Sequence, residues 1–325
     1  MRYGFLAGWT AAGLGGKVEL SKQPADLPMV LANMALGGFG ITLLRALSRI
    51  SGGPPMLSSN ELRDSAARIS WAFVSLFNFP EVMSLIRGMN TEKPYWLAAL
   101  EYAAGGCLQA VLDEYAHILR ESLSLLNQDP AETARQVSDA IYRAVTLRTP
   151  TLAVDDVRLD RLHKLVVIES NRMRIRFARR YGEDRSAETD EAATPKDQVR
   201  EAFNSPFWPF VLVTTSVGQE GLDFHQYCHA VVHWNLPSNP VDLEQREGRV
   251  HRYKSHAVRK NLALRFGHEG LDGRIDPWEF LFERGQKNRP DGQSDLVPFW
   301  IFAFDGAAKI ERHMPMLPLS RDIDA

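Results

Sequence analysis

Residues 245–252, Gln-Arg-Glu-Gly-Arg-Val-His-Arg, gather three arginines around one glycine. On a helix, Gln245, Arg249 and Arg252 would be spaced i, i+4 and i+7 and would share one face. Gly248 on the same side lacks a side chain, so an approaching group can come close. Planar guanidinium groups on a rigid element suit bidentate contacts with phosphate. The stretch therefore predicts a site that binds a phosphate group.

A second polar stretch follows a short apolar run. Residues 211–214, Val-Leu-Val-Thr, are typical of a buried strand. Open α/β sheets bind ligands just beyond the carboxyl ends of their strands. Small residues and free backbone NH groups suit contact with phosphate oxygens there. The small and hydroxyl-bearing residues at this point are Thr214, Thr215, Ser216, Gly218 and Gly221, and Asp223 then offers a carboxylate that could accept hydrogen bonds from a ribose hydroxyl.

The two stretches are separated by a strand, a loop and a helix start. Residues 230–234 have the length and β-branched content of a strand. Asn239 is a suitable helix cap, Pro240 suits the first helical position, and Asp242 and Glu244 favour the N-terminus of the helix. We therefore expect the arginine-bearing stretch to lie on a helix that follows this strand and loop.

The ordered pair "TTSVGQEGLD" and "QREGRVHR" resembles motifs V and VI of superfamily 2 helicases and translocases, and the form "GRVHR" is closest to the Swi/Snf-like branch. The resemblance covers roughly residues 160–260. It implies an α/β fold, namely a RecA-like parallel-sheet helicase C-terminal lobe, preceded here by a mainly α-helical region. Such a lobe belongs to a nucleic-acid-dependent ATPase.

The resemblance also assigns roles to residues. It implies that Arg249 and Arg252 are arginine fingers that reach ATP on a partner lobe. It places Gln245, Asp223, Gly221 and Gly248 near the nucleotide. It implies nucleic-acid contacts, with double-stranded DNA favoured by the Swi/Snf-like form, from the first residues of the polar stretch: Thr214, Thr215, Ser216 and Gly218.

One part of the motor is missing from the sequence. No GxxxxGK[ST] motif and no DExH-like box occurs, and the nearest candidate, "GLGGKV", has Val18 after its lysine. We expect an N-terminal RecA-like lobe, in cis or in trans, to hold ATP and Mg²⁺. This chain alone is then inactive and is a fragment of a larger motor. The alternatives are a non-enzymatic helicase-like module that binds nucleic acid or protein, and a helical half that is an independent interaction domain.

A second basic stretch, "NRMRIRFARRYG", alternates Arg172, Arg174 and Arg176 with apolar residues. This period of two predicts a strand with one basic face. That face either contacts a phosphate backbone, through Arg174 and Arg176, or is a solvated sheet edge. The strand-like run 165–168 lies too close to this stretch to fit the helix that normally separates the first two strands. Either it is not that first strand or the lobe carries an insertion.

The remaining composition narrows the class of protein. A formal net charge of -2 provides no general attraction for nucleic acid, so a polyanion site must be local. Cys107 and Cys228 exclude a disulfide framework and favour reduced thiols in a cytoplasmic protein. We expect no metal site, although His225, His229 and His233 are spaced by four, because the sequence there is loop and strand.

We divide the chain into a helical region (1–150), which is expected to be an insertion or a module between the lobes, the RecA-like lobe (151–265), and a C-terminal extension (266–325), which is expected to be truncated. Within the helical region, helix starts are expected at Asn60 and at Asp129-Pro130, and helical spacing continues over 95–126. Residues 27–44 carry no charge and form either a membrane helix or, as we favour, a buried core helix broken near its glycines. The extension is expected to contain a helix near 278–284 and a strand near 299–304.

Overall fold

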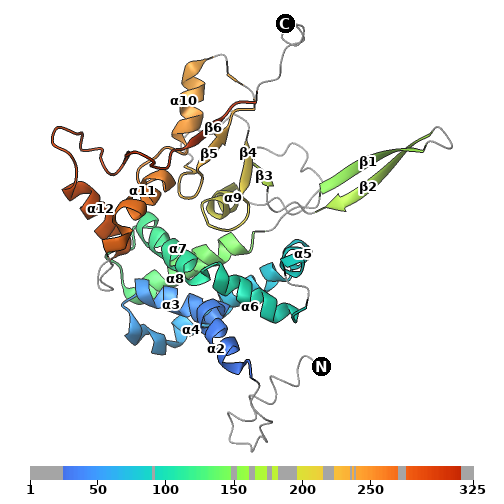
Figure 1. The fold of residues 1–325 in the computed structure, drawn as a ribbon, viewed down its shortest axis with the longest axis horizontal. Coiled ribbons are helices and arrows are strands. Elements are labelled where there is room, and N and C mark those ends of the chain that lie inside the picture. The colour runs from blue at the N-terminus through green and yellow to red at the C-terminus, as the bar shows by residue number, and fades with distance from the viewer. Residues whose placement is uncertain are drawn as a thin grey trace, which may run out of the picture.

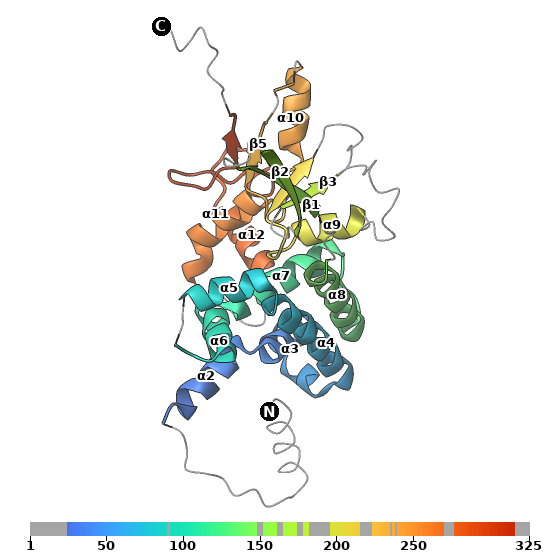
Figure 2. The ribbon, with the colours of Figure 1, turned by 90° about the vertical axis from the view of Figure 1, so that its right-hand side faces the viewer.

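The structure is a computed structural model that describes residues 25–89, 92–147, 152–160, 165–173, 178–181, 196–214, 223–234, 236–237, 239–269 and 276–315. Figures 1 and 2 show a helical bundle on one side and an α/β part on the other. The bundle contains α2 (Leu27–Gly37), α3 (Phe39–Ile50), a 3₁₀ turn (Pro54–Ser58), α4 (Asn60–Phe77), α5 (Pro80–Met89), α6 (Tyr95–Gly105), α7 (Leu108–Ser122) and α8 (Pro130–Val145).

Local capping explains where these helices begin and end. The Asp129 carboxylate accepts hydrogen bonds from the NH groups of Ala131 and Glu132, which confirms the predicted start of α8. The predicted cap of α4 is wrong by one residue, because Ser59 caps the helix and Asn60 is already helical. The helical pattern over 95–126 is split at Cys107, which adopts a left-handed backbone (φ 52°) between α6 and α7.

The uncharged stretch forms two helices, α2 and α3, bent by 43° at Gly38. The expectation of a buried core helix is correct for α3 and wrong for α2, whose Met29, Leu31 and Leu36 are more than half exposed. A Cβ added at Gly37 would lie 2.6 Å from the backbone nitrogen of Ala104, so α2 packs closely on α6 instead. No single described helix is long and apolar enough to cross a membrane, although the bent pairs α2–α3 and α4–α5 have the required length and composition together.

The core of the bundle lies between α3, α4, α7 and α8. Burying one large apolar side chain here contributes about 1.5–3 kcal/mol. The largest fully buried side chains of this core are Leu43, Leu47, Leu62, Ile69, Phe73, Leu112, Tyr115 and Ile141. Phe207 and Tyr227 of the α/β part pack against this core, so the two parts share an apolar interface.

The described residues of the α/β part form three strand pairs. The pair β1 (Leu152–Asp160) and β2 (Leu165–Met173) is an antiparallel hairpin. The pair β3 (Ala178–Tyr181) and β4 (Val211–Thr214) is parallel, as is the pair β5 (Ala230–Val232) and β6 (Glu311–His313). The helix α9 (Lys196–Phe203) precedes β4, and α10 (Pro240–Gly248) follows β5. Parallel pairs combined with helices make this part an α/β unit.

The hairpin resolves the alternatives for residues 165–168. Val157 pairs with Ile168 and Ala153 pairs with Arg172, so this run belongs to the hairpin, which projects from the rest of the chain in Figure 1. It is therefore not the first strand of the parallel sheet. Only part of the expected strand with a basic face belongs to the described residues. Arg172 lies in β2, whereas Arg174 and Arg176 lie outside the described residues.

The C-terminal extension packs back onto the α/β part. It follows α11 (His256–Phe266) and a 3₁₀ turn (Gly267–Glu269), and it contains the predicted helix as α12 (Pro277–Lys287), capped by Asp276. The predicted strand near 299–304 is wrong, because that backbone is irregular and bonds to the Asn261 side chain. The extension provides β6 instead, which pairs with β5.

Candidate functional site

The arginine-bearing stretch begins on α10 and leaves it. The Asn239 side chain accepts a hydrogen bond from the NH of Val241 (3.0 Å), which fixes the predicted start of the helix. The helix ends at Gly248, and Arg249 is its C-cap. The NH of Val250 donates to the carbonyl of Glu247 (3.0 Å), a tightened last turn that carries the chain away from the axis. The expected common helix face is therefore wrong, because Arg252 lies beyond the helix.

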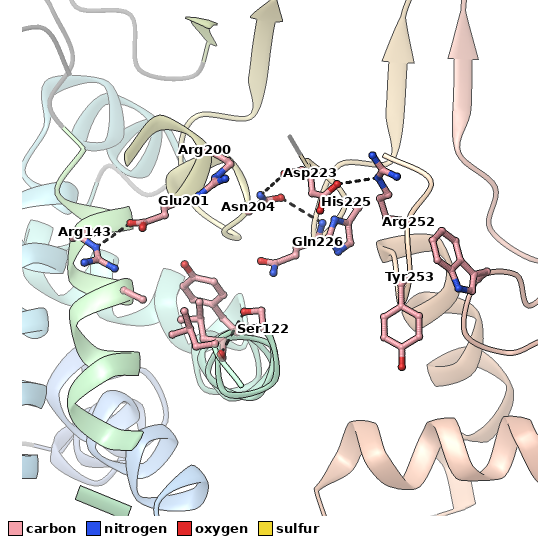
Figure 3. A pocket seen from close by; sticks show the side chains of 15 residues that line it. Ser122, Arg143, Arg200, Glu201, Asn204, Asp223, His225, Gln226, Arg252 and Tyr253 are labelled. Carbon is pink, nitrogen blue, oxygen red and sulfur yellow. Dashed lines mark hydrogen bonds and ion pairs between the residues drawn. The ribbon is translucent and has the colours of Figure 1, made fainter. Parts of the chain in front are cut away.

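Three contacts join residues 249–256 to residues 223–225. The NH of Phe224 donates to the carbonyl of Arg249 (2.9 Å), and the NH of His256 donates to the carbonyl of His225 (2.8 Å). The Nε of Arg252 lies 2.8 Å from Oδ1 of Asp223 (Figure 3). The two polar stretches are thus held together, and the contacts place Arg249, Arg252 and Asp223 at one junction.

The electrostatics of this junction favour an anion. Arg249 is half-buried, and burial, with the neighbouring charges of Arg246 and Arg252, lowers the pKa of its guanidinium. A negative group placed nearby would relieve this repulsion. The Arg252–Asp223 pair is partly exposed on both sides, and such pairs contribute only about 0–1 kcal/mol. A phosphate could therefore replace Asp223 as the partner of Arg252 at little cost.

The structure says less about the other predicted site residues. Thr214 is exposed at the end of β4, and Gln245 is exposed on α10. Thr215, Ser216, Gly218 and Gly221 lie outside the described residues. Gly248 lines a cavity of about 720 Å³ between α10, α11 and the extension. The roles proposed for these residues stay predictions.

A cavity of about 710 Å³ separates the junction from the helical bundle (Figure 3). Each arginine of its lining has a carboxylate partner, although Asp197, the partner of Arg200, lies outside the lining. The three pairs are Arg143–Glu201 (2.9 Å), Arg200–Asp197 (3.4 Å) and Arg252–Asp223 (2.8 Å). Because each guanidinium group is already paired, the lining of this cavity is not a concentrated anion site.

Sequence reasoning missed one residue that supports the junction. The amide of Asn204 donates to the carbonyl of Asp223 (2.8 Å), and its oxygen lies 3.5 Å from the NH of Gln226. Asn204 follows α9 and so ties that helix to the loop containing Asp223. Nothing in its sequence neighbourhood signals this contact, because the partners meet only through the fold.

The spaced histidines point in different directions. His233 is buried with Nε2 3.3 Å from a Glu247 oxygen, while His225 lines the cavity beside Asp223 and His229 is exposed. Burial lowers the pKa of His225, partly opposed by Asp223. Within the described residues, no group of three or more His, Cys, Asp or Glu side chains could hold a metal ion.

Comparison with known proteins gives a class for this region. Residues 157–254 match the family model described as the helicase conserved C-terminal domain. One relative is the "Uncharacterized ATP-dependent helicase YqhH" of Bacillus subtilis (strain 168), which is 40% identical over 57 residues. That match spans 18% of this chain and 10% of the relative. No solved structure matches the chain. These similarities support a helicase-type C-terminal lobe in the α/β part.

Proposed function

We propose that the α/β part is the C-terminal motor lobe of a nucleic-acid-dependent ATPase, either a helicase or a DNA translocase. In this proposal, Arg249 and Arg252 act as arginine fingers on ATP held with Mg²⁺ by an N-terminal RecA-like lobe, in cis or in trans. The observation that carries the proposal is the junction itself, where backbone hydrogen bonds and an ion pair hold residues 249–256 against residues 223–225. The family match over residues 157–254 and the ATP-dependent helicase relative support it.

The residues at the junction fit a polyphosphate. Arg249 is partly withdrawn from water there, and the charges of Arg246 and Arg252 act against its own charge. Bound ATP supplies the γ-phosphoryl group that passes to water. Arg249 stabilises the negative charge that develops on this group, and Arg252 exchanges Asp223 for a phosphate oxygen. An arginine finger of this kind contributes about 10³–10⁵ in rate.

The same exchange assigns a role to Asp223. Once Arg252 turns to phosphate, the Asp223 carboxylate is released and can accept hydrogen bonds from a ribose hydroxyl. Its position remains fixed because Asn204 holds its backbone carbonyl (2.8 Å). Gln245, on the exposed side of α10, is assigned to the nucleotide, and Thr214, at the end of β4, to the nucleic-acid backbone. The Swi/Snf-like form of the arginine stretch favours double-stranded DNA, and two free cysteines favour a cytoplasmic protein.

The test is ATP turnover by the complete protein. Arg249→Ala should lower kcat by about 10³-fold with little change in KM for ATP, since the finger acts in the transition state. Arg265→Ala, which removes an exposed arginine of α11 on the same lobe, is the matched control and should turn over normally. Turnover by Arg249→Ala within about twofold of the unaltered protein would refute the finger assignment.

A second measurement separates the motor from a non-enzymatic binding module. ATP hydrolysis is compared with no nucleic acid, double-stranded DNA, single-stranded DNA and RNA. The proposal expects stimulation that is largest with double-stranded DNA. Binding of nucleic acid without any hydrolysis would favour the non-enzymatic alternative.

A further inference from the structure

We propose that Glu121, on helix α7 of the helical bundle, is a positioning residue for the arginine-bearing segment 249–256. The inference rests on the proposed function, since it assigns the helical bundle a part in the same reaction. What carries it is the meeting of one bundle carboxylate with two cations of the α/β part, Lys254 and Arg259.

The three residues form a closed, largely buried ring. One Glu121 oxygen pairs with Nζ of Lys254, and the other lies 2.9 Å from an Nη of Arg259. The Nε of Arg259 donates to the backbone carbonyl of Lys254 (2.9 Å), which closes the ring. The side chains of Glu121, Lys254 and Arg259 are 21%, 16% and 8% exposed, so water competes weakly for these contacts.

The ring fixes a loop that would not adopt its shape unaided. Lys254 has a left-handed backbone (φ 53°), a conformation that side-chain-bearing residues rarely adopt. Such strain persists only where the surroundings impose it. Here the surroundings are Glu121, the carbonyl of Phe299, which accepts the NH of Lys254 (2.7 Å), and the Phe282 ring, 4.5 Å from Nζ.

The fixed loop is continuous with the site. The NH of Ser255 donates to the carbonyl of Arg252 (3.1 Å), and the NH of His256 donates to the carbonyl of His225 (2.8 Å). A shift of Lys254 therefore displaces Arg252 and the junction that also holds Arg249. The direction of the arginine side chains is thereby set by a helix that belongs to the other part of the molecule.

Other contacts attach α7, the helix that bears Glu121, to helices α11 and α12. Ile118 of α7 is fully buried in the apolar cluster formed by α11 and α12. His117 Nδ1 lies 2.8 Å from the Asp276 carboxylate that caps α12, and Arg120 lies 3.6 Å from it. The Arg259 guanidinium lies 4.8 Å from the Trp278 ring of α12. Glu121 thus acts from a helix that is already anchored on the α/β part.

The chain provides a matched control for loss of an ion pair between the two parts. Glu201 of α9 pairs with Arg143 of α8 (2.9 Å), so it also joins the α/β part to the bundle. No described contact links Glu201 to residues 249–256. Glu201→Gln therefore removes a comparable carboxylate without touching the loop, while Glu121→Gln opens the ring and Glu121→Asp keeps its charge.

Two readouts are measured on the complete protein. Hydrogen exchange without nucleotide reports how strongly the backbone of residues 252–256 is held in place. Steady-state ATP turnover gives kcat and KM. For Glu121→Gln we expect exchange in this segment to rise at least about tenfold, and kcat to fall by about 10- to 100-fold with KM for ATP unchanged within about twofold. Glu121→Asp should recover part of both effects, and Glu201→Gln should show neither.

The outcomes separate this inference from the proposed function. If Arg249→Ala abolishes turnover while Glu121→Gln leaves both exchange and kcat unchanged, the positioning role is overturned and the motor assignment stands. If Glu201→Gln lowers kcat as much as Glu121→Gln, docking of the two parts in general accounts for the effect, and the positioning role is again overturned. If Arg249→Ala turns over normally, the finger assignment fails, and the role of Glu121 in positioning the arginine-bearing segment for catalysis is overturned with it.

Discussion

Replacing Asn261 with alanine should release the C-terminal extension from α11. The Asn261 amide donates to the carbonyls of Phe302 (2.8 Å) and Ala308 (3.0 Å), and its oxygen accepts the NH of Ala308 (2.7 Å). Asn261 is 3% exposed, so the substitution leaves three backbone groups without partners in a buried place. Each such hydrogen bond contributes about 1 kcal/mol, and an unsatisfied buried group costs about 1–3 kcal/mol. We expect the free energy of unfolding to fall by about 3–5 kcal/mol.

Urea unfolding measures this loss, and hydrogen exchange at residues 311–313 locates it. The control is Asn288→Ala, because Asn288 makes one local bond to the Arg284 carbonyl (2.8 Å) on the exposed surface and should cost about 0.5 kcal/mol or less. A loss below about 1 kcal/mol for Asn261→Ala would refute the reasoning, since the three bonds would then be replaceable by water. Unchanged exchange in β6 would refute the idea that Asn261 holds this strand in place.

Further outcomes follow from other contacts. Gly37→Ala should destabilise the chain by about 1–3 kcal/mol, because its Cβ would press on the backbone of α6, whereas Gly88→Ala has open space and should be neutral or slightly stabilising in urea unfolding. Asp129→Ala should cost about 1 kcal/mol through loss of the α8 cap, and no change in the urea midpoint would contradict this. Burial lowers the folded-state pKa of both His225 and His256, so the unfolded state binds more protons and stability should fall as the pH drops below about 6.5. Urea curves at pH 7.5 and 5.5 test this, and His225→Gln should reduce the difference.

The features that could be predicted from the sequence are those fixed by neighbouring residues. Asp129 and Asn239 cap their own helices, and their partners lie within three residues. The hairpin of β1 with β2, and the pairing of β6 with β5, depend on strands that choose between several partners. Short apolar runs do not specify that choice, which is why residues 165–168 were open to two interpretations and the strand near 299–304 was misplaced.

The candidate site likewise combines features that could be predicted from neighbouring residues with contacts that depend on the fold. The motif resemblance singled out Asp223 and Arg252, which form an ion pair in the structure. The spacing of Gln245, Arg249 and Arg252 predicted a continuous helix to Arg252, but the tight turn at Val250 ends α10 first. The contact of Glu121 with Lys254 joins residues far apart in the chain. Only the packing of α7 on the α/β part brings them together, and no local pattern encodes that packing.

The pairing of β5 with β6 has a consequence for folding during synthesis. The contacts of α2 to α8 are complete once residue 145 has emerged, so the bundle can fold while the rest of the chain is still being made. The edge of β5, with Val232 58% exposed, stays open until residues 311–313 appear. An open edge invites pairing with other chains. Tyr115 of the bundle packs on Phe207 and Tyr227 of the α/β part. The folded bundle thereby offers the α/β part a surface to pack on before β6 has been synthesised.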